Sequence, residues 1–186
     1  SNSGLPWSDS LIDRYEDRWG WQSLSSSSDL PWSEALIERF EDRWDWKWHG
    51  LSDNPDLPWS EALLDRYKDR WKWVPFGLSW NSGLPWSEAF IKRYEYRWNW
   101  DSLSGNSGLP WSEALIERYE DHWQWDEYGL SSNSGLPWTG ALIKQYEDRW
   151  EWVREYGIAQ GLSDNPGLPW SEALIDRYEE RWNWGD

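Results

Sequence analysis

The chain has 186 residues, including 23 Trp, and its 34 acidic and 18 basic side chains give a formal net charge of −16. This acidic balance argues against nucleic acid as a partner, because phosphate binding depends on Lys and Arg. It favours solubility, cationic partners or divalent metal, of which solubility is the commonest. The absence of Cys excludes disulfides and thiolate metal sites. No apolar run approaches the roughly 20 residues of a membrane span and no signal peptide opens the chain, so we expect a soluble protein of unknown compartment.

One motif recurs along the whole chain. It reads Leu-Pro-Trp-Ser at residues 57–60, and seven Pro-Trp steps are spaced 25 to 32 residues apart, at Trp7, Trp32, Trp59, Trp86, Trp111, Trp138 and Trp170. Such self-similarity indicates a tandem-repeat array, in which each unit buries its apolar face against its neighbours. We therefore predict a single seven-repeat array over residues 1–186. Because no alternating strand pattern persists, we expect an all-α solenoid or superhelix with one main short helix per repeat and a turn-rich connector.

Each repeat opens with a predicted helix. In the second repeat, Ser33 is placed to cap the helix and Glu34 to complement the positive end of its dipole. The block runs as far as Trp46. Its counterparts predict main helical blocks near residues 8–21, 33–46, 60–73, 87–100, 112–125, 139–152 and 171–184.

The helical period sorts each block into three sides. The apolar side of the second block, which we expect to be buried, consists of Leu36, Ile37, Phe40 and Trp44. Arg39 and Arg43 lie on one flank, and acidic residues cover the far side and the other flank. If successive helices stack in parallel, the acidic flank of one faces the arginine flank of the next. Exposed ion pairs are weak individually, so this contact would set register more than stability.

Of the 23 tryptophans, 21 occupy three positions that recur in every repeat. We call them the first (Pro-Trp), second and third (Trp-x-Trp) tryptophans of each repeat. We interpret the first and second as structural core: Trp7, Trp32, Trp59, Trp86, Trp111, Trp138 and Trp170, with Trp19, Trp44, Trp71, Trp98, Trp123, Trp150 and Trp182. The alternative is an aromatic platform for sugars, quaternary ammonium groups or proline-rich peptides. The third tryptophan, Trp46 in the second repeat, falls on the arginine flank if the helix continues, where a structural cation–π ladder would form.

A connector of variable length follows the third tryptophan. Its clearest copy runs from Leu51 to Leu57 and is rich in turn formers. Two, four or nine residues separate the third tryptophan from the connector Leu. Insertions of this kind often mark the binding face of a solenoid. Five aromatic residues outside the motif lie in these connectors, and we predict that they bind a partner and cluster along one edge: Trp48, Phe76, Trp80, Tyr128 and Tyr156. Local loop packing is the alternative.

The repeat resembles the Trp-rich tandem repeats of the form LPWSxxLIxxxEDxWDWxxLSxNP found in uncharacterised bacterial proteins. In the second repeat the likeness rests on residues 30–33, 36–37, 41–42, 44–46 and 51–55. It extends over essentially the whole chain. The resemblance implies kinship and no particular substrate. The chain departs from the pattern between the second and third tryptophans, where Asp is replaced at Gly20, Lys72, Gln124 and Glu151. We infer that this Asp is not a required ligand.

No catalytic, metal-binding or cofactor-binding constellation stands out, so we predict a protein that is not an enzyme and needs no cofactor. The only histidines are His49 and His122, and adjacent carboxylates such as Glu41-Asp42 recur on solvated helix faces instead of forming a unique pair. The function we favour is a non-enzymatic scaffold for protein or peptide interaction. Two alternatives remain: a carbohydrate- or cell-surface-binding module that uses exposed aromatics, and a structural or filament-forming array that self-associates through its ends.

Overall fold

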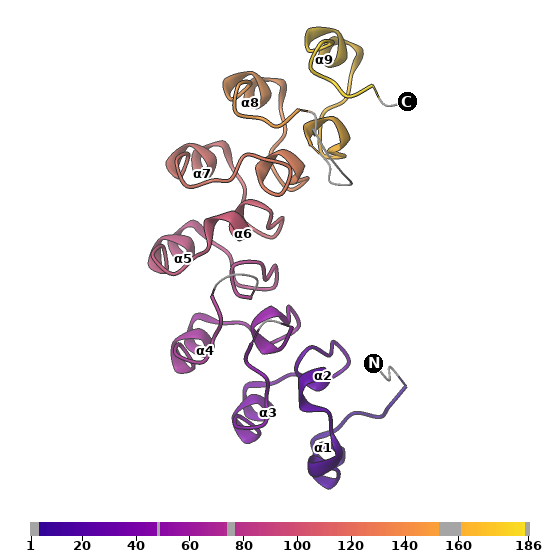
Figure 1. Ribbon diagram of the computed structural model, residues 1–186. Coiled ribbons are helices and arrows are strands. Elements are labelled where there is room, and N and C mark those ends of the chain that lie inside the picture. Colours follow the sequence, from indigo (N-terminus) through magenta and orange to yellow (C-terminus); the bar gives the residue numbers. More distant parts are fainter. Residues whose placement is uncertain (1–3, 48, 74–76, 153–160, 185–186) are drawn as a thin grey trace. The chain divides into compact units, whose positions relative to one another are not determined.

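The computed structural model describes residues 4–47, 49–73, 77–152 and 161–184. In these ranges every regular element is helical and there is no strand, which confirms the predicted all-α class (Figure 1). The chain divides into two compact units, one of Ser1–Trp86 with Phe90–Trp98 and the other of Ser87–Ala89 with Asn99–Asp186. The single array over residues 1–186 and its solenoid form remain predictions.

Each repeat contributes one main helix that begins where its cap predicts. The Ser33 hydroxyl accepts a hydrogen bond from the Leu36 N–H at 3.1 Å, satisfying a donor of the first turn. The same bond begins α1, α4, α7, α8 and α9. The main helices are α1 (Asp9–Arg14), α3 (Glu34–Arg39), α4 (Glu61–Arg66), α5 (Glu88–Arg93), α7 (Glu113–Arg118), α8 (Gly140–Gln145) and α9 (Glu172–Arg177).

The main helices are shorter than predicted. In the block expected over residues 33–46 the main helix ends at Arg39. In the other six blocks the main helix ends at the equivalent position. At Phe40 the backbone leaves the helical region, with φ −118° and ψ 30°. The indole N–H of Trp44 donates to the Ile37 carbonyl at 3.2 Å, which a continuing helix would pair with a backbone amide. A side chain thus caps the helix end, and residues 40–44 form turns. In the first repeat the turn includes the 3-10 helix η1 (Glu16–Arg18).

The apolar side of each main helix is buried, as the helical period predicts. In the second repeat Leu36, Ile37, Phe40 and Trp44 are between 0 and 5% exposed. The connector leucine, such as Leu51, is also fully buried. The buried leucine therefore anchors its connector in the core.

The connectors take two forms, depending on their length. The short ones continue into the α-helices α2 (Trp21–Ser25) and α6 (Trp100–Ser104). Three of the longer ones end in the 3-10 helices η2 (Leu51–Asp53), η3 (Leu130–Ser132) and η4 (Leu162–Asp164), and the fourth ends in turns at residues 78–80. In both forms the connector serine donates to the carbonyl of the third tryptophan, at 2.7 Å in Ser25–Trp21 and 2.5 Å in Ser52–Trp46. The backbone frame is thus the same whether or not a loop is inserted.

Backbone hydrogen bonds close the inserted loops at their base. The Leu51 N–H donates to the Asp45 carbonyl at 2.8 Å, and Leu162 makes the same bond to Glu151 at 2.8 Å across a much longer insertion. In the connectors with an insertion the residue before the connector leucine is glycine, because a Cβ atom on Gly50 would lie 2.1 Å from the Asp45 carbonyl oxygen. Loop length can vary between repeats because the closing bond does not depend on it.

Candidate functional site

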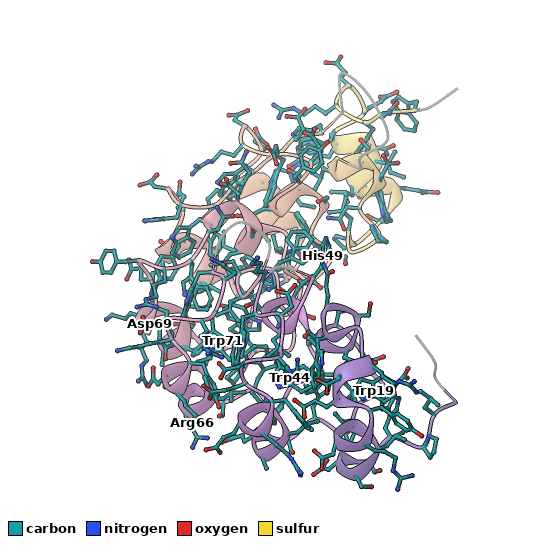
Figure 2. The ribbon with its side chains drawn as sticks, turned by 60° about the horizontal axis from the view of Figure 1, so that its bottom comes forward. Trp19, Trp44, His49, Arg66, Asp69 and Trp71 are labelled. Atoms are coloured by element: carbon teal, nitrogen blue, oxygen red, sulfur yellow. The ribbon has the colours of Figure 1, made fainter. Side chains whose placement is uncertain are left out.

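The second tryptophan lies at the junction between consecutive repeats. Trp71 is only 4% exposed, and its indole N–H donates to the Leu64 carbonyl at 3.2 Å. Its ring centroid lies 4.9 Å from that of Trp59, the first tryptophan of the same repeat, and 4.7 Å from that of Trp46 in the preceding repeat. Figure 2 labels Trp71 together with its counterparts Trp19 and Trp44. The second tryptophan therefore joins the aromatic clusters of two repeats.

The first tryptophan is less buried than the second. Trp59 is half-buried, and its indole N–H donates to the Asn54 carbonyl at 2.9 Å. Among the residues predicted as core, Trp138 is 8% exposed and Trp170 is 43% exposed. This difference follows from the next connector: a Cβ atom on Gly167 would lie 2.8 Å from the Trp138 ring, whereas Trp170 has no following connector among the described residues.

The third tryptophan packs on the next repeat. The Trp46 ring centroid lies 4.8 Å from that of Tyr67, and the Arg70 guanidinium lies 5.2 Å from it. The cation–π contact expected from the sequence is present, but its arginine belongs to the following repeat. Because the helix ends at Arg39, Trp46 does not lie on the arginine flank of its own helix. Other pairs of this kind are Arg43–Trp21, Arg97–Trp73, Arg149–Trp125 and Arg181–Trp152.

Ion pairs join the acidic side of one repeat to the arginines of the next. Arg70 lies 2.6 Å from Asp42 and donates to the Glu41 carbonyl at 2.5 Å, while Arg66 lies 3.3 Å from Glu38. The Asp42 hydrogen bond raises the pKa of Arg70 above its ordinary value. Most of these side chains are more than a third exposed, so each pair stabilises the fold little. Their constant direction fits the expected role in setting register.

Connector serines and asparagines form a second, buried link between repeats. Ser52 is fully buried, and its hydroxyl accepts a hydrogen bond from the Lys72 N–H of the next repeat at 2.9 Å. The Asn81 side chain donates to the Ser52 and Asn54 carbonyls at 3.2 and 3.1 Å. Sequence reasoning missed these roles, although the recurring Leu-Ser-x-Asn spacing was the available signal. Position 72 contributes its backbone N–H to this link, which explains why its side-chain type varies between repeats.

Two of the five predicted partner-binding residues lie in the described ranges. Trp80 is 45% exposed and Tyr128 is 61% exposed. They belong to different units, so their clustering along one edge remains a prediction. The other three predicted residues, Trp48, Phe76 and Tyr156, lie outside the described ranges.

The backbone beneath Trp80 is held by buried neighbours. Leu78 and Ser79 are fully buried, and Asn81 is 2% exposed. The Leu78 N–H donates to the Lys72 carbonyl at 2.9 Å, and the Ser79 hydroxyl donates to the Trp73 carbonyl at 2.7 Å. An aromatic ring held on an ordered backbone loses less conformational entropy when a ligand binds. The Trp80 ring is therefore exposed on an ordered backbone.

Sequence reasoning missed one prominent aromatic residue, Tyr96, which is 99% exposed. It occupies the place of the Asp in the Glu-Asp pair, where Asp42 lies in the second repeat. That departure from the repeat was the signal that could have identified it. Because Tyr96 follows a main helix and is not in a connector, it provides an exposed aromatic against which the connector residues can be compared.

The ionisable groups weighed as catalytic candidates make structural contacts. His49 lies 3.7 Å from Asp53, and burial raises the pKa of that carboxyl, with the His49 charge opposing the shift. The His122 ring centroid lies 4.8 Å from that of Trp100. In the described ranges no three Asp, Glu or His side chains are grouped to hold a metal ion. Nor does any helix there have the length and apolar character needed to cross a membrane.

No protein family, curated protein or solved structure matches this chain. The resemblance to Trp-rich bacterial repeats therefore remains a prediction from the sequence.

Proposed function

We propose that the protein is a non-enzymatic repeat scaffold that binds a protein or peptide through the aromatic residues of its connectors. The observation that carries this proposal is the contrast between two kinds of tryptophan. Second-position rings such as Trp71 are buried and hydrogen-bonded inside the array, whereas Trp80 presents almost half of its surface from an ordered connector. Packing between repeats accounts for buried motif tryptophans such as Trp71, whereas Trp80 and Tyr128 present exposed ring surface for recognition.

The charge of the chain supports a basic partner. With a net charge of −16, the protein attracts cationic segments and repels acidic ones. Exposed indole and phenol rings contact guanidinium and ammonium groups favourably, by about 0.5–1 kcal/mol per exposed pair. A peptide that combines Arg or Lys with aromatic residues matches both properties. Salt should weaken the charged part of this contact.

Selection from a displayed peptide library on the immobilised protein tests the proposal. We expect enrichment of peptides that contain Arg or Lys together with aromatic residues, with Kd values that rise with salt. The double variant Trp80→Ser/Tyr128→Ser should weaken binding of a selected synthetic peptide at least about tenfold, a loss of about 1.4 kcal/mol. The matched control is Tyr96→Ser, which removes a more exposed ring outside the connectors and should leave the Kd unchanged.

Equal loss of binding in both variants would contradict a connector site and indicate general aromatic adhesion. Retention of full affinity by the double variant would refute the involvement of these two residues. Parallel incubation with a glycan array tests the carbohydrate alternative, which predicts binding of sugars that depends on Trp80 and is insensitive to salt.

A further inference from the structure

The main helices other than α8 end in an arginine, which at several contacts between repeats pairs with acids of the preceding main helix. We call this residue the bridging arginine. In the fullest arrangement, Arg93 donates to Glu61 and, at 2.6 Å, to Asp65. The same guanidinium lies 5.4 Å from the centroid of the Tyr94 ring. Two acids and an aromatic ring thus form a site for one guanidinium group.

The sixth repeat lacks the bridging arginine. Its main helix α8 ends at Gln145, whereas α7 of the fifth repeat keeps both acids, Glu113 and Glu117. The two helices belong to the same unit and lie next to each other (Figure 1). Both acids are exposed; the Thr139 hydroxyl donates to Glu113 at 3.5 Å, and Glu117 forms no ion pair among the described residues. The fifth repeat therefore holds two carboxylates without the arginine that bridges such acids elsewhere.

The aromatic part of the site is retained. Tyr146 follows Gln145 as Tyr94 follows Arg93, and it is 5% exposed. The Tyr94 hydroxyl donates to Asp65 at 2.7 Å, whereas the buried Tyr146 hydroxyl has no hydrogen-bond partner in the described ranges. Gln145 and Tyr146 line a surface hollow of about 450 Å³. A phenol oxygen accepts hydrogen bonds, so this one can receive an N–H group of a ligand in the hollow.

The cations of the sixth repeat that the structure describes leave the two acids unpaired. Arg149 pairs with Glu120 at 2.7 Å. Lys144 is exposed and forms no ion pair in the described part of the chain. The pKa of Tyr146 is raised first by burial and next by the charges of Glu120 and Glu117, with amide and cationic neighbours opposing the shift. The surroundings of this hydroxyl are therefore acidic, which favours a cationic ligand.

We propose that the contact between α7 and α8 binds an arginine side chain of a partner, in the place that the bridging arginine fills elsewhere. The array itself defines the ligand, because its own arginines occupy the equivalent sites. A planar guanidinium with several N–H donors matches two carboxylates and a phenol oxygen better than a compact ammonium group does. This site goes beyond the proposed connector site, since it lies on main helices and uses neither Trp80 nor Tyr128.

Nuclear magnetic resonance titration with N-acetyl-arginine methylamide, at constant ionic strength, provides the test. We expect saturable shifts centred on Glu117, Gln145 and Tyr146, with a Kd in the millimolar range because the ion pairs are exposed. The citrulline analogue has the same shape without the charge and should cause no saturable shift. The lysine analogue should bind more weakly than the arginine probe.

Filling the site from within is the sharpest variant. Gln145→Arg restores the bridging arginine and should abolish the shifts in α7 and α8 without removing any acid. Glu113→Gln/Glu117→Gln should abolish them by removing the charges. Its matched control is Asp101→Asn/Asp121→Asn, which removes the same charge from exposed positions of the same unit and should leave the Kd unchanged.

Opening an equivalent site in the other unit tests whether the missing arginine creates the site. Arg93→Gln leaves Glu61 and Asp65 without their guanidinium and should add a second set of saturable shifts around these residues. The connector variant Trp80→Ser/Tyr128→Ser should bind the probe like the unmodified chain. That result separates this site from the connector site, whose own test is the binding of a selected peptide.

Four outcomes would overturn the proposal. They are absence of saturable shifts at Gln145 in the unmodified chain, persistent binding in the Gln145→Arg protein, equal binding of the citrulline analogue, and failure of Arg93→Gln to gain a second site. Loss of probe binding in the connector variant would contradict it too, because the probe would then bind at the connectors. The dispersion of each variant's spectrum confirms that the variant is folded.

Discussion

Replacing a central second tryptophan by alanine tests how the array is stabilised. Trp71 is 4% exposed and contacts aromatic rings of its own repeat and of the preceding one. Burial of a large aromatic removes about 150–250 Å² from water, worth about 4–6 kcal/mol at 25 cal/mol per Å². Alanine keeps a small part of this, and the Leu64 carbonyl loses its indole donor. We therefore expect Trp71→Ala to lower the free energy of unfolding by about 3–5 kcal/mol.

Urea unfolding followed by near-ultraviolet circular dichroism measures this loss, provided that the m-value is unchanged. The matched control is Trp80→Ala, in the same repeat and unit, which removes a ring that is 45% exposed and should cost below about 1 kcal/mol. Equal losses in the two variants would refute the division between structural and exposed tryptophans. A large loss for Trp80→Ala alone would mean that Trp80, and not Trp71, is the structural ring.

Three further predictions follow from single contacts. Ser52→Ala should lower the free energy of unfolding in urea by about 1–3 kcal/mol, because it removes both hydrogen bonds of a buried hydroxyl that links two repeats. Its control, Ser82→Ala, changes an exposed serine and should leave the free energy of unfolding unchanged. Gly129→Ala should lower the melting temperature, since its Cβ would lie 2.0 Å from a carbonyl oxygen; Gly140→Ala in α8 meets open space and should raise it. Burial and, second, the Asp65 hydrogen bond raise the pKa of Tyr94 to about 12. Because the fold favours the neutral phenol, this stabilisation should be complete below pH 10 and disappear as the pH rises towards 12. Tyr94→Phe should flatten that part of a stability–pH profile; an unchanged profile would contradict the assignment.

The parts of the fold that the sequence predicts depend on short-range patterns. The serine caps and the buried side of each helix follow from residue types within one or two turns, as Ser33 and Ile37 illustrate. The end of the helix could not be predicted in this way, because it depends on an indole that folds back over seven residues to a carbonyl. A helical period alone continues through that point, and so the predicted blocks were too long.

The links between repeats were only partly predictable. Opposite charges on the two flanks indicated the arginine–acid pairs, since charge type is visible in the sequence. The bonds of Ser52 and Asn81 join residues 20, 27 and 29 positions apart. In each bond one partner is a backbone N–H or carbonyl, which gives no signal in the residue type. For the candidate site, departure from the repeat in the connectors predicted Trp80 and Tyr128, whereas Tyr96 follows a main helix and lies outside the connectors.

Hydrogen exchange of the indole N–H groups, followed by nuclear magnetic resonance, tests the central claim most directly. Buried, hydrogen-bonded indoles such as those of Trp44, Trp71 and Trp123 should exchange only when the array opens, far more slowly than the indole of Trp80. That result would place the motif tryptophans in the stable interior and leave the connector ring free to bind. Exchange of the motif indoles as fast as that of Trp80 would contradict the account.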